Sequence, residues 1–263
     1  MVHIKREITR KQTVVYKLIF YFAKMYLSFS FLVLATTLVY SNAALAPFIK
    51  KCKWDDSKCI KETAQATIPI FAAGIPELGV QKLDPFFMKT LDASSPGLKL
   101  KLWDVTGTGL KDCVAKKVQR DIAKSTIKVK LQCSVDFVGK YEMNGRLLIL
   151  PIEGKGDAHV VLRKVIILAE VNVADQVGKN GDKHWTIKSW KHSYDVKEKS
   201  TIELENLFNG NEVLGRAARE LIASSSNEIV KEVGPPIIKG VVGKIMENVE
   251  NFFQNVPSSE LYA

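Results

Sequence analysis

The sequence lacks the short motifs that mark many enzyme and cofactor sites. It contains no G-x-S-x-G, no H-E-x-x-H, no phosphate-binding G-x-x-x-x-G-K-[ST] and no G-x-G-x-x-G, so it gives no support for the hydrolases and nucleotide-binding proteins that carry them. It has only four histidines, and no spacing of cysteine and histidine suits zinc. We therefore expect a protein that is not an enzyme, without catalytic residues, metal or cofactor.

A concentrated excess of positive charge is also lacking. Lys and Arg total 38 and Asp and Glu total 28, which gives a formal net charge of +10. Residues 1–43 hold six of these basic side chains and one of the acidic ones, which leaves 32 and 27 for the rest of the chain. Because nucleic-acid binding needs a dense basic patch, we expect no nucleic-acid partner. A transient membrane or receptor contact is compatible with this charge.

Long apolar runs are confined to the start of the chain. Residues 26–40 read YLSFSFLVLATTLVY, follow a basic stretch and precede the small residues of 41–44. This order is typical of a secretory signal. We expect residues 1–43 to be removed and residues 44–263 to form a single ligand-binding domain that is secreted, extracellular and monomeric. The alternative is a signal anchor that stays in the membrane, although the run is short and interrupted by Ser and Thr.

Cysteine is scarce, but its even number suggests disulfides in a secreted chain. The four cysteines are Cys52, Cys59, Cys113 and Cys133. Proximity favours a pair between Cys52 and Cys59. A hairpin turn near Ala123 would place Cys113 directly opposite Cys133. However, the parity of Val114 and Val118 places Cys113 on the other face of its strand, so the sequence leaves this second pair open.

Hydrophobic periodicity predicts a helix at the start of the domain and strands after it. The helix is expected over 57–73, with Ser57 as its N-cap and with a kink or break at Pro69. A β-rich region follows over about 98–207. Within it, residues 126–137 alternate between apolar and polar without interruption, which indicates a strand with one dry face.

Local signals within the β-rich region predict turns and a bulge. Asn144-Gly145 and Asn180-Gly181 are dipeptides typical of hairpin turns. Between Ile187 and Trp190 the inward parity of the apolar residues changes, as it does at a β-bulge.

The last quarter of the chain is predicted to be helical. Apolar residues share one helical stripe over 211–233 and again over 237–253. We expect Gly234-Pro235-Pro236 to interrupt the helix between them. Strands followed by helices indicate an α+β fold, with the helix against a concave face of the sheet.

Four blocks of the sequence resemble one family, in the same order. They are CKWDDSKC at 52–59, GIPELGVQKLDP at 74–85, YEMNGRLLILPIEGKG at 141–156 and LENLFNGN at 204–211. From Cys52 to about Tyr262 the chain is similar to the insect takeout and juvenile-hormone-binding protein family. The resemblance implies the Cys52–Cys59 disulfide and a strongly curved antiparallel β-sheet wrapped around a long C-terminal α-helix. It also implies an internal hydrophobic tunnel that carries a terpenoid hormone-like molecule, a fatty acid or another lipid.

An apolar helix that faces an apolar sheet provides two dry walls, and a gap between them would form a pocket for a ligand. The residues expected to line this tunnel are Phe71, Phe86, Phe87, Trp103, Val135, Phe137, Leu148, Leu150, Trp190, Phe208, Leu214, Leu221, Ile238, Val242, Met246 and Phe253. Plain core packing is the alternative for each of them. Tyr141, Tyr194 or Ser225 is a candidate anchor for a polar head group.

The leading hypothesis for function is a secreted carrier of a small hydrophobic ligand. The alternative is an extracellular protein–protein signalling module without a ligand, which would have a filled interior and a large exposed apolar patch. A hydrolase of lipid esters is a third hypothesis.

Overall fold

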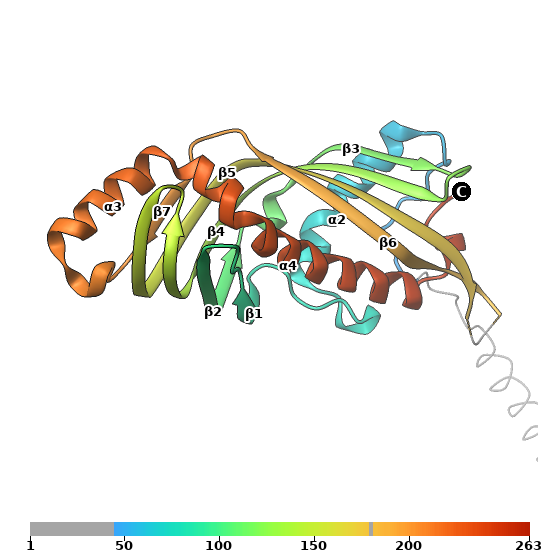
Figure 1. Ribbon diagram of the computed structural model, residues 1–263. Coiled ribbons are helices and arrows are strands. Elements are labelled where there is room, and N and C mark those ends of the chain that lie inside the picture. Colours follow the sequence, from blue (N-terminus) through green and yellow to red (C-terminus); the bar gives the residue numbers. More distant parts are fainter. Residues whose placement is uncertain (1–44, 179–180) are drawn as a thin grey trace, which may run out of the picture. The chain divides into compact units, whose positions relative to one another are not determined.

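The computed structural model describes residues 45–178 and 181–263, which belong to one unit, Leu45–Ala263. The predicted secretory signal, residues 1–43, lies outside the described residues. The order of elements is a helix, then strands, then helices (Figure 1). The elements are α2 (Ser57–Ala73), β1 (Phe86–Asp92), β2 (Leu98–Thr108), β3 (Val114–Asp121), β4 (Thr126–Leu147), β5 (Leu150–Val177), β6 (Lys183–Val196), β7 (Thr201–Leu204), α3 (Glu212–Ser224) and α4 (Ser226–Asn255). In the parts of the chain that the structure describes, no helix combines the length and the hydropathy needed to cross a membrane.

The strands form one curved antiparallel sheet in the order β1-β2-β4-β5-β6 (Figure 1). Strand β3 pairs with β4, and β7 pairs with β5. The backbone of the sheet is the long hairpin of β4 and β5, which are 22 and 28 residues long. The predicted alternation over 126–137 is thus the first half of β4. The sequence signals missed strand β1, which lies before the expected β-rich region.

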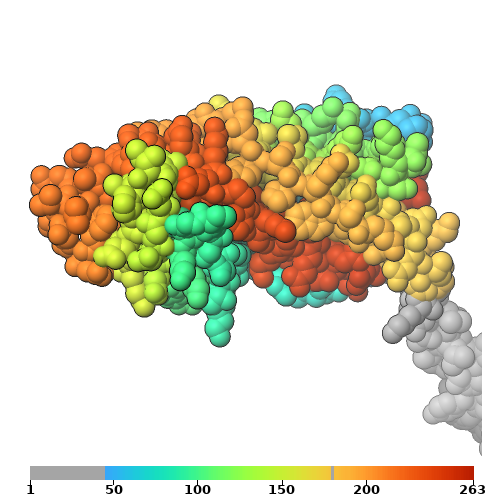
Figure 2. Space-filling view, viewed as in Figure 1, coloured from blue at the N-terminus to red at the C-terminus, as the bar shows by residue number. Residues whose placement is uncertain are grey.

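Helix α4 covers the concave face of the sheet and contacts both of its edge strands, β1 and β6. Figure 2 shows α4, in red, between the teal β1–β2 hairpin and the golden β6. The predicted fold class, a curved antiparallel sheet around a long C-terminal helix, is confirmed.

Buried apolar side chains fall into three clusters that follow one another along β4. The first cluster surrounds Trp185 and includes Phe252 and Phe253 near the end of α4. The second contains Cys133 and Val135 of β4. The third surrounds Tyr141 and includes Ile222 of α3. Sheet and helices therefore share a continuous interior, of which the Tyr141 cluster is the part that α3 covers.

Both disulfides are present. Cys52 pairs with Cys59, with 5.7 Å between their Cα atoms, and Cys113 pairs with Cys133, with 4.4 Å between theirs. The parity conflict at Cys113 is resolved by a bulge. The pairing of β3 with β4 shifts by one residue between Ala115 and Lys117. A residue before the bulge therefore lies on the same face as residues an odd number of positions later, beyond the bulge.

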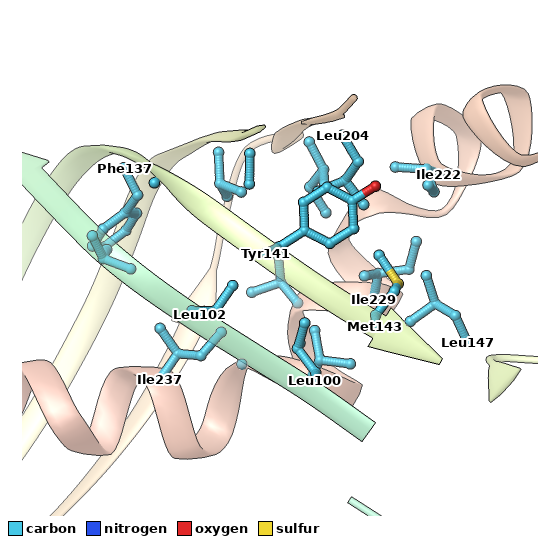
Figure 3. Close-up of a pocket in the computed structure, with 18 of the residues that line it drawn as sticks. Leu100, Leu102, Phe137, Tyr141, Met143, Leu147, Leu204, Ile222, Ile229 and Ile237 are labelled. Carbon is cyan, nitrogen blue, oxygen red and sulfur yellow. The ribbon is translucent and has the colours of Figure 1, made fainter. Parts of the chain in front are cut away.

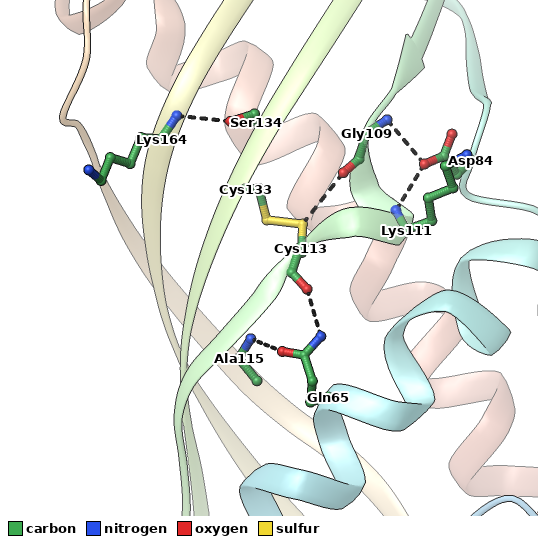
Figure 4. The surroundings of a disulfide bond; sticks show 9 residues. All are labelled: Gln65, Asp84, Gly109, Lys111, Cys113, Ala115, Cys133, Ser134 and Lys164. Carbon is green, nitrogen blue, oxygen red and sulfur yellow. Dashed lines mark hydrogen bonds between the residues drawn. A yellow bond between two sulfur atoms is a disulfide. The ribbon is translucent and has the colours of Figure 1, made fainter.

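Side chains from α2 and from the loop before β1 fix the chain around the Cys113–Cys133 bond (Figure 4). The Gln65 side chain of α2 donates to the Cys113 carbonyl at 3.1 Å and accepts from the Ala115 backbone N–H at 2.7 Å. The Asp84 carboxylate accepts from the backbone N–H groups of Gly109 and Lys111 at 3.0 and 2.9 Å. Helix α2 therefore docks on β3 through a side chain that satisfies backbone groups.

Helix α2 has its predicted bounds, but two details differ from expectation. Its N-cap is Asp56 and not Ser57, because the Asp56 carboxylate accepts from the Cys59 backbone N–H at 2.9 Å. The helix also continues through Pro69 without a break.

The turn prediction at Asn144-Gly145 is wrong. Strand β4 runs through both residues to Leu147, which pairs with Leu150 of β5, so the hairpin turns at Leu148 and Ile149. The Leu148 N–H donates to the Glu232 carboxylate at 3.2 Å, which holds this apolar turn against α4.

The β5–β6 connection agrees with the hairpin predicted at Asn180-Gly181, since Val177 pairs with Lys183. Asn180 itself lies outside the described residues. The predicted bulge is confirmed by a register shift between Asn172 and Val173, whose partners are Ser189 and Ile187.

The break between the last two helices is at Ser225 and not at Gly234-Pro235-Pro236. Ser225 has non-helical angles, φ −115° and ψ 27°, and lies in a run of three serines, whose side chains compete for backbone hydrogen bonds. Helix α4 continues through both prolines. In the preceding turn, the Tyr194 hydroxyl donates to the Val230 carbonyl at 2.9 Å, which joins α4 to β6.

Candidate functional site

An apolar cavity of about 130 Å³ lies between the sheet and the two C-terminal helices (Figure 3). Its wall comes from β2, β4, β5 and β7 on the sheet side and from α3 and α4 on the helix side. The residues that line it are Leu98, Leu100, Leu102, Val105, Phe137, Val138, Gly139, Lys140, Tyr141, Met143, Leu147, Ala158, Val160, Leu162, Ile202, Leu204, Ile222, Ile229, Val230, Val233, Gly234, Ile237 and Ile238.

The sheet wall arises because alternate residues of each strand point to the same face. Strand β2 contributes alternate leucines from Leu98 to Leu102, and β5 contributes alternate residues from Ala158 to Leu162. On the helix side, Ile229, Val233 and Ile237 follow one another at intervals of four residues in α4, which places them on one face.

No polar surface is exposed inside this cavity. Lys140 belongs to the wall, but its ammonium group pairs with Asp157 at 2.7 Å. Tyr141 is fully buried, and its hydroxyl donates to the Glu205 carbonyl at 2.6 Å. Burial, and to a lesser degree the charge of Glu205, raises the pKa of Tyr141 to about 12. The phenol therefore stays neutral, with its proton engaged by the backbone.

Among the three candidate anchors for a polar head group, only Tyr141 lines the cavity. The Tyr194 hydroxyl is engaged by the Val230 carbonyl, and burial raises the pKa of Tyr194. Ser225 is the joint between α3 and α4. The cavity is therefore suited to an apolar ligand that needs no hydrogen bond from the protein.

Two of the residues expected to line the tunnel, Phe137 and Ile238, line this cavity. The others lie elsewhere. Leu148, Leu150 and Phe208 pack against the Tyr141 cluster, whereas Phe71, Trp190, Met246 and Phe253 belong to the Trp185 cluster or pack against it. Phe86 and Val135 are in the Cys133 cluster, Val242 is buried, and Trp103 and Leu221 are half-buried. Phe87 and Leu214 are 53% and 50% exposed.

The expected set favoured aromatic residues, and several of these fill the interior. Phe86, for example, packs edge-on against Phe137 with ring centres 5.7 Å apart. Most of the missed wall residues are aliphatic. A usable signal for them was present, because Leu98, Leu100 and Leu102 alternate with lysines and a tryptophan, as in a strand with one dry face.

No metal centre emerges from the residues that the structure describes, since no group of three or more His, Cys, Asp or Glu side chains could hold an ion. What the geometry offers is an apolar space between the sheet and the C-terminal helices.

An open, curved antiparallel sheet that a C-terminal helix closes over an apolar cavity defines a class of proteins suited to carrying hydrophobic molecules. The chain belongs to the haemolymph juvenile hormone binding protein (JHBP) family, whose family model matches residues 30–263. This match confirms the family indicated by the four sequence blocks.

Individual relatives agree with this assignment. The crystal structure of Takeout 1 from Epiphyas postvittana is 30% identical, covers 81% of this chain and 99% of its own, and superposes with a TM-score of 0.79. The circadian clock-controlled protein daywake of Drosophila melanogaster is 26% identical over 226 residues, 81% of this chain and 86% of its own. A putative beta-carotene-binding protein of Schistocerca gregaria is 21% identical over 206 residues, 77% of this chain and 82% of its own.

Proposed function

We propose that this protein is a secreted, monomeric carrier that binds a small hydrophobic molecule in the cavity between the sheet and helices α3 and α4. The inner surface of that cavity, where only apolar atoms are exposed, is the observation that carries the proposal. Because such a surface offers water no hydrogen bonds, binding energy comes from apolar burial, about 25 cal/mol per Å². A terpenoid, a fatty acyl chain or another lipid fits this chemistry. The family description and the name of the locust relative support it.

The proposal includes residues 1–43 as a secretory signal and residues 44–263 as the carrier domain. Two disulfides support an oxidising compartment for the domain.

The size of the cavity limits what it accepts without movement. Its volume of about 130 Å³ is close to the ~150 Å³ that holds one benzene ring, whereas drug-sized ligands occupy roughly 300–1,000 Å³. Helix α3 is the wall element best suited to move, because only Gly215, Ala218 and Ile222 of it are buried. In our proposal α3 moves outward about Ser225 when a longer ligand enters.

A displacement assay tests the carrier function. The neutral fluorophore N-phenyl-1-naphthylamine serves as the probe and farnesol, a terpenoid alcohol, as the competitor. Ala158→Phe places a ring in the cavity wall and should weaken farnesol binding by about tenfold or more. Ala223→Phe makes the same change at an exposed position of α3 and should leave binding unchanged. Equal binding by both variants would refute this site. If the folded wild-type protein binds neither compound and yields no lipid on solvent extraction, the carrier function is wrong.

A further inference from the structure

A second cavity, of about 220 Å³, lies toward the other end of α4 and shares no lining residue with the first. Its wall includes Ile60 and Thr67 of α2, Phe252 of α4 and Tyr262 near the end of the chain. It also includes two cationic side chains, Lys50 and Arg120 of β3.

Strand β3 carries Arg120 to the dry side of the sheet. Arg120 pairs with Ile127 of β4, as Val118 pairs with Val129, so Arg120 and Val118 share one face. Val118 is buried. The guanidinium carbon of Arg120 lies 4.1 Å from the centre of the Trp185 ring and 4.9 Å from that of the Tyr262 ring.

The aromatic faces stabilise the positive charge of Arg120, but they do not replace hydrogen-bond acceptors for its in-plane N–H groups. Within the described part of the chain, the Nε and Nη1 atoms of Arg120 are buried without a hydrogen-bond partner, and so is the Nε1 atom of Trp185. Buried donors left unpaired are costly and rare. Two residues in contact, each with unpaired donors, indicate that an acceptor belongs between them.

The protein supplies no such acceptor among its described residues. No carboxylate there lies within 4.0 Å of the Arg120 guanidinium. Burial lowers the pKa of Arg120, and the charges of Tyr262 and Asp175 oppose this effect. The guanidinium, a group that does not deprotonate in proteins, therefore has no ion-pair partner among the described residues.

We propose that this second cavity binds a small amphipathic carboxylic acid. Its carboxylate accepts hydrogen bonds from Arg120 and Trp185, and its apolar part lies against Ile60 and Phe252. A hydrogen bond from a charged guanidinium N–H to a carboxylate is roughly twice as strong as one between neutral groups. The volume of about 220 Å³ exceeds the ~150 Å³ that holds benzene, so an acid with one ring or a short chain fits. The proposal is independent of the cavity on which the carrier function rests.

Calorimetric titration with octanoate and with 1-octanol at pH 7.5 tests this site, because the two probes share a chain length and differ in the charge of the head group. We expect the wild-type protein to bind octanoate about tenfold to a hundredfold more tightly, the ratio expected for hydrogen bonds to a charged group. Arg120→Gln should abolish this preference, and Arg120→Lys, which keeps the charge but lacks the planar set of N–H donors, should retain only part of it. The exposed control Arg216→Gln should behave like wild type.

Testing each variant with the probe for the other cavity distinguishes the two binding sites. Ala158→Phe should leave octanoate binding intact, and Arg120→Gln should leave farnesol binding intact. Equal affinity of the wild-type protein for octanoate and octanol overturns the acid site, as does an octanoate preference that persists in Arg120→Gln. If Arg120→Gln does not fold, the NMR resonance of the Trp185 indole N–H in the wild-type protein tests the acid site instead. It should shift with octanoate but not with octanol, and equal shifts with both overturn the site.

Discussion

The hydroxyl of Tyr141 donates a 2.6 Å hydrogen bond to the backbone carbonyl of Glu205. This contact joins β4 to the segment that follows β7, and it lies directly behind the wall of the apolar cavity. Tyr141 is fully buried, and its hydroxyl proton is bonded to the protein backbone, so it is not free to donate to a ligand. This arrangement separates the role of Tyr141 in stability from any role in binding.

Tyr141→Phe should therefore lower stability without weakening the binding of a terpenoid. We expect the free energy of unfolding to fall by about 1–3 kcal/mol, because a buried carbonyl loses its donor. Farnesol affinity should stay within about twofold of wild type. Urea denaturation and the displacement assay measure the two quantities. Tyr262→Phe is the control, since Tyr262 is 37% exposed, and surface changes usually cost less than about 0.5 kcal/mol. Unchanged stability together with weaker farnesol binding would instead make Tyr141 a ligand anchor.

The fold was predictable from the sequence because its signals are long and periodic. The alternation over 126–137 defined a dry face for β4, and the apolar stripe of the last quarter defined the helix that covers it. Shorter signals were less reliable. Asn144-Gly145 has the composition of a hairpin turn, yet both residues pair with neighbouring strands on either side. Pairing with β2 and β5 overrides the local preference of a dipeptide.

The cavity was less predictable than the fold, because a cavity is defined by where side chains fail to meet. Periodicity assigns Trp190 and Leu102 equally to the dry side of the sheet. Trp190 packs into the aromatic cluster around Trp185, whereas Leu102 borders empty space. The difference depends on the volumes of side chains across the interior, which one strand's pattern does not contain. Arg120 was also missed, because an arginine is not expected on the dry face that it shares with Val118.

His159 of β5 lies between two carboxylates on neighbouring strands. Its Nδ1 is 3.0 Å from the Glu203 carboxylate of β7, and its Nε2 is 3.0 Å from the Asp136 carboxylate of β4. Hydrogen bonds first to Glu203 and then to Asp136 raise the pKa of His159 above its usual value. Because β7 also supplies Ile202 and Leu204 to the cavity wall, this ion cluster holds part of that wall.

The charge of His159 should make stability depend on pH near neutrality. A histidine with a raised folded-state pKa gives its full stabilisation below its unfolded value, about 6.5, and loses it as pH rises through the folded value. We expect the melting temperature to fall between pH 6 and pH 8.5, and this slope to be reduced in His159→Gln. The change should not exceed about 2–4 °C, because exposed ion pairs contribute at most about 1 kcal/mol.

His192→Gln provides a control of opposite sign. Burial, followed by the charge of Lys239, lowers the pKa of His192. Its contribution to stability is therefore lost as pH falls below about 6.5, and not as pH rises. If the two variants change the pH profile in the same direction, the electrostatic account of His159 is wrong.

Three glycines of α4 lie at its contacts with the two edge strands of the sheet. An added Cβ at Gly243 would lie 3.8 Å from the Trp190 ring of β6, which is an ordinary contact. At Gly240 it would lie 3.2 Å from a methyl group of Leu91 in β1, which must move slightly. At Gly234 it would lie 2.8 Å from the Tyr194 hydroxyl, the group that donates to the Val230 carbonyl.

Replacing each glycine by alanine should therefore give a graded series. Alanine is favoured over glycine inside a helix by roughly 0.5–1 kcal/mol, so Gly243→Ala should raise the free energy of unfolding by about that amount. Gly240→Ala should raise it less, because the Leu91 side chain must shift. Gly234→Ala should lower it by about 1 kcal/mol or more, because displacing the Tyr194 hydroxyl breaks a buried hydrogen bond. Urea denaturation of the three variants measures the series. Equal effects at all three positions would mean that α4 does not close the sheet through these contacts.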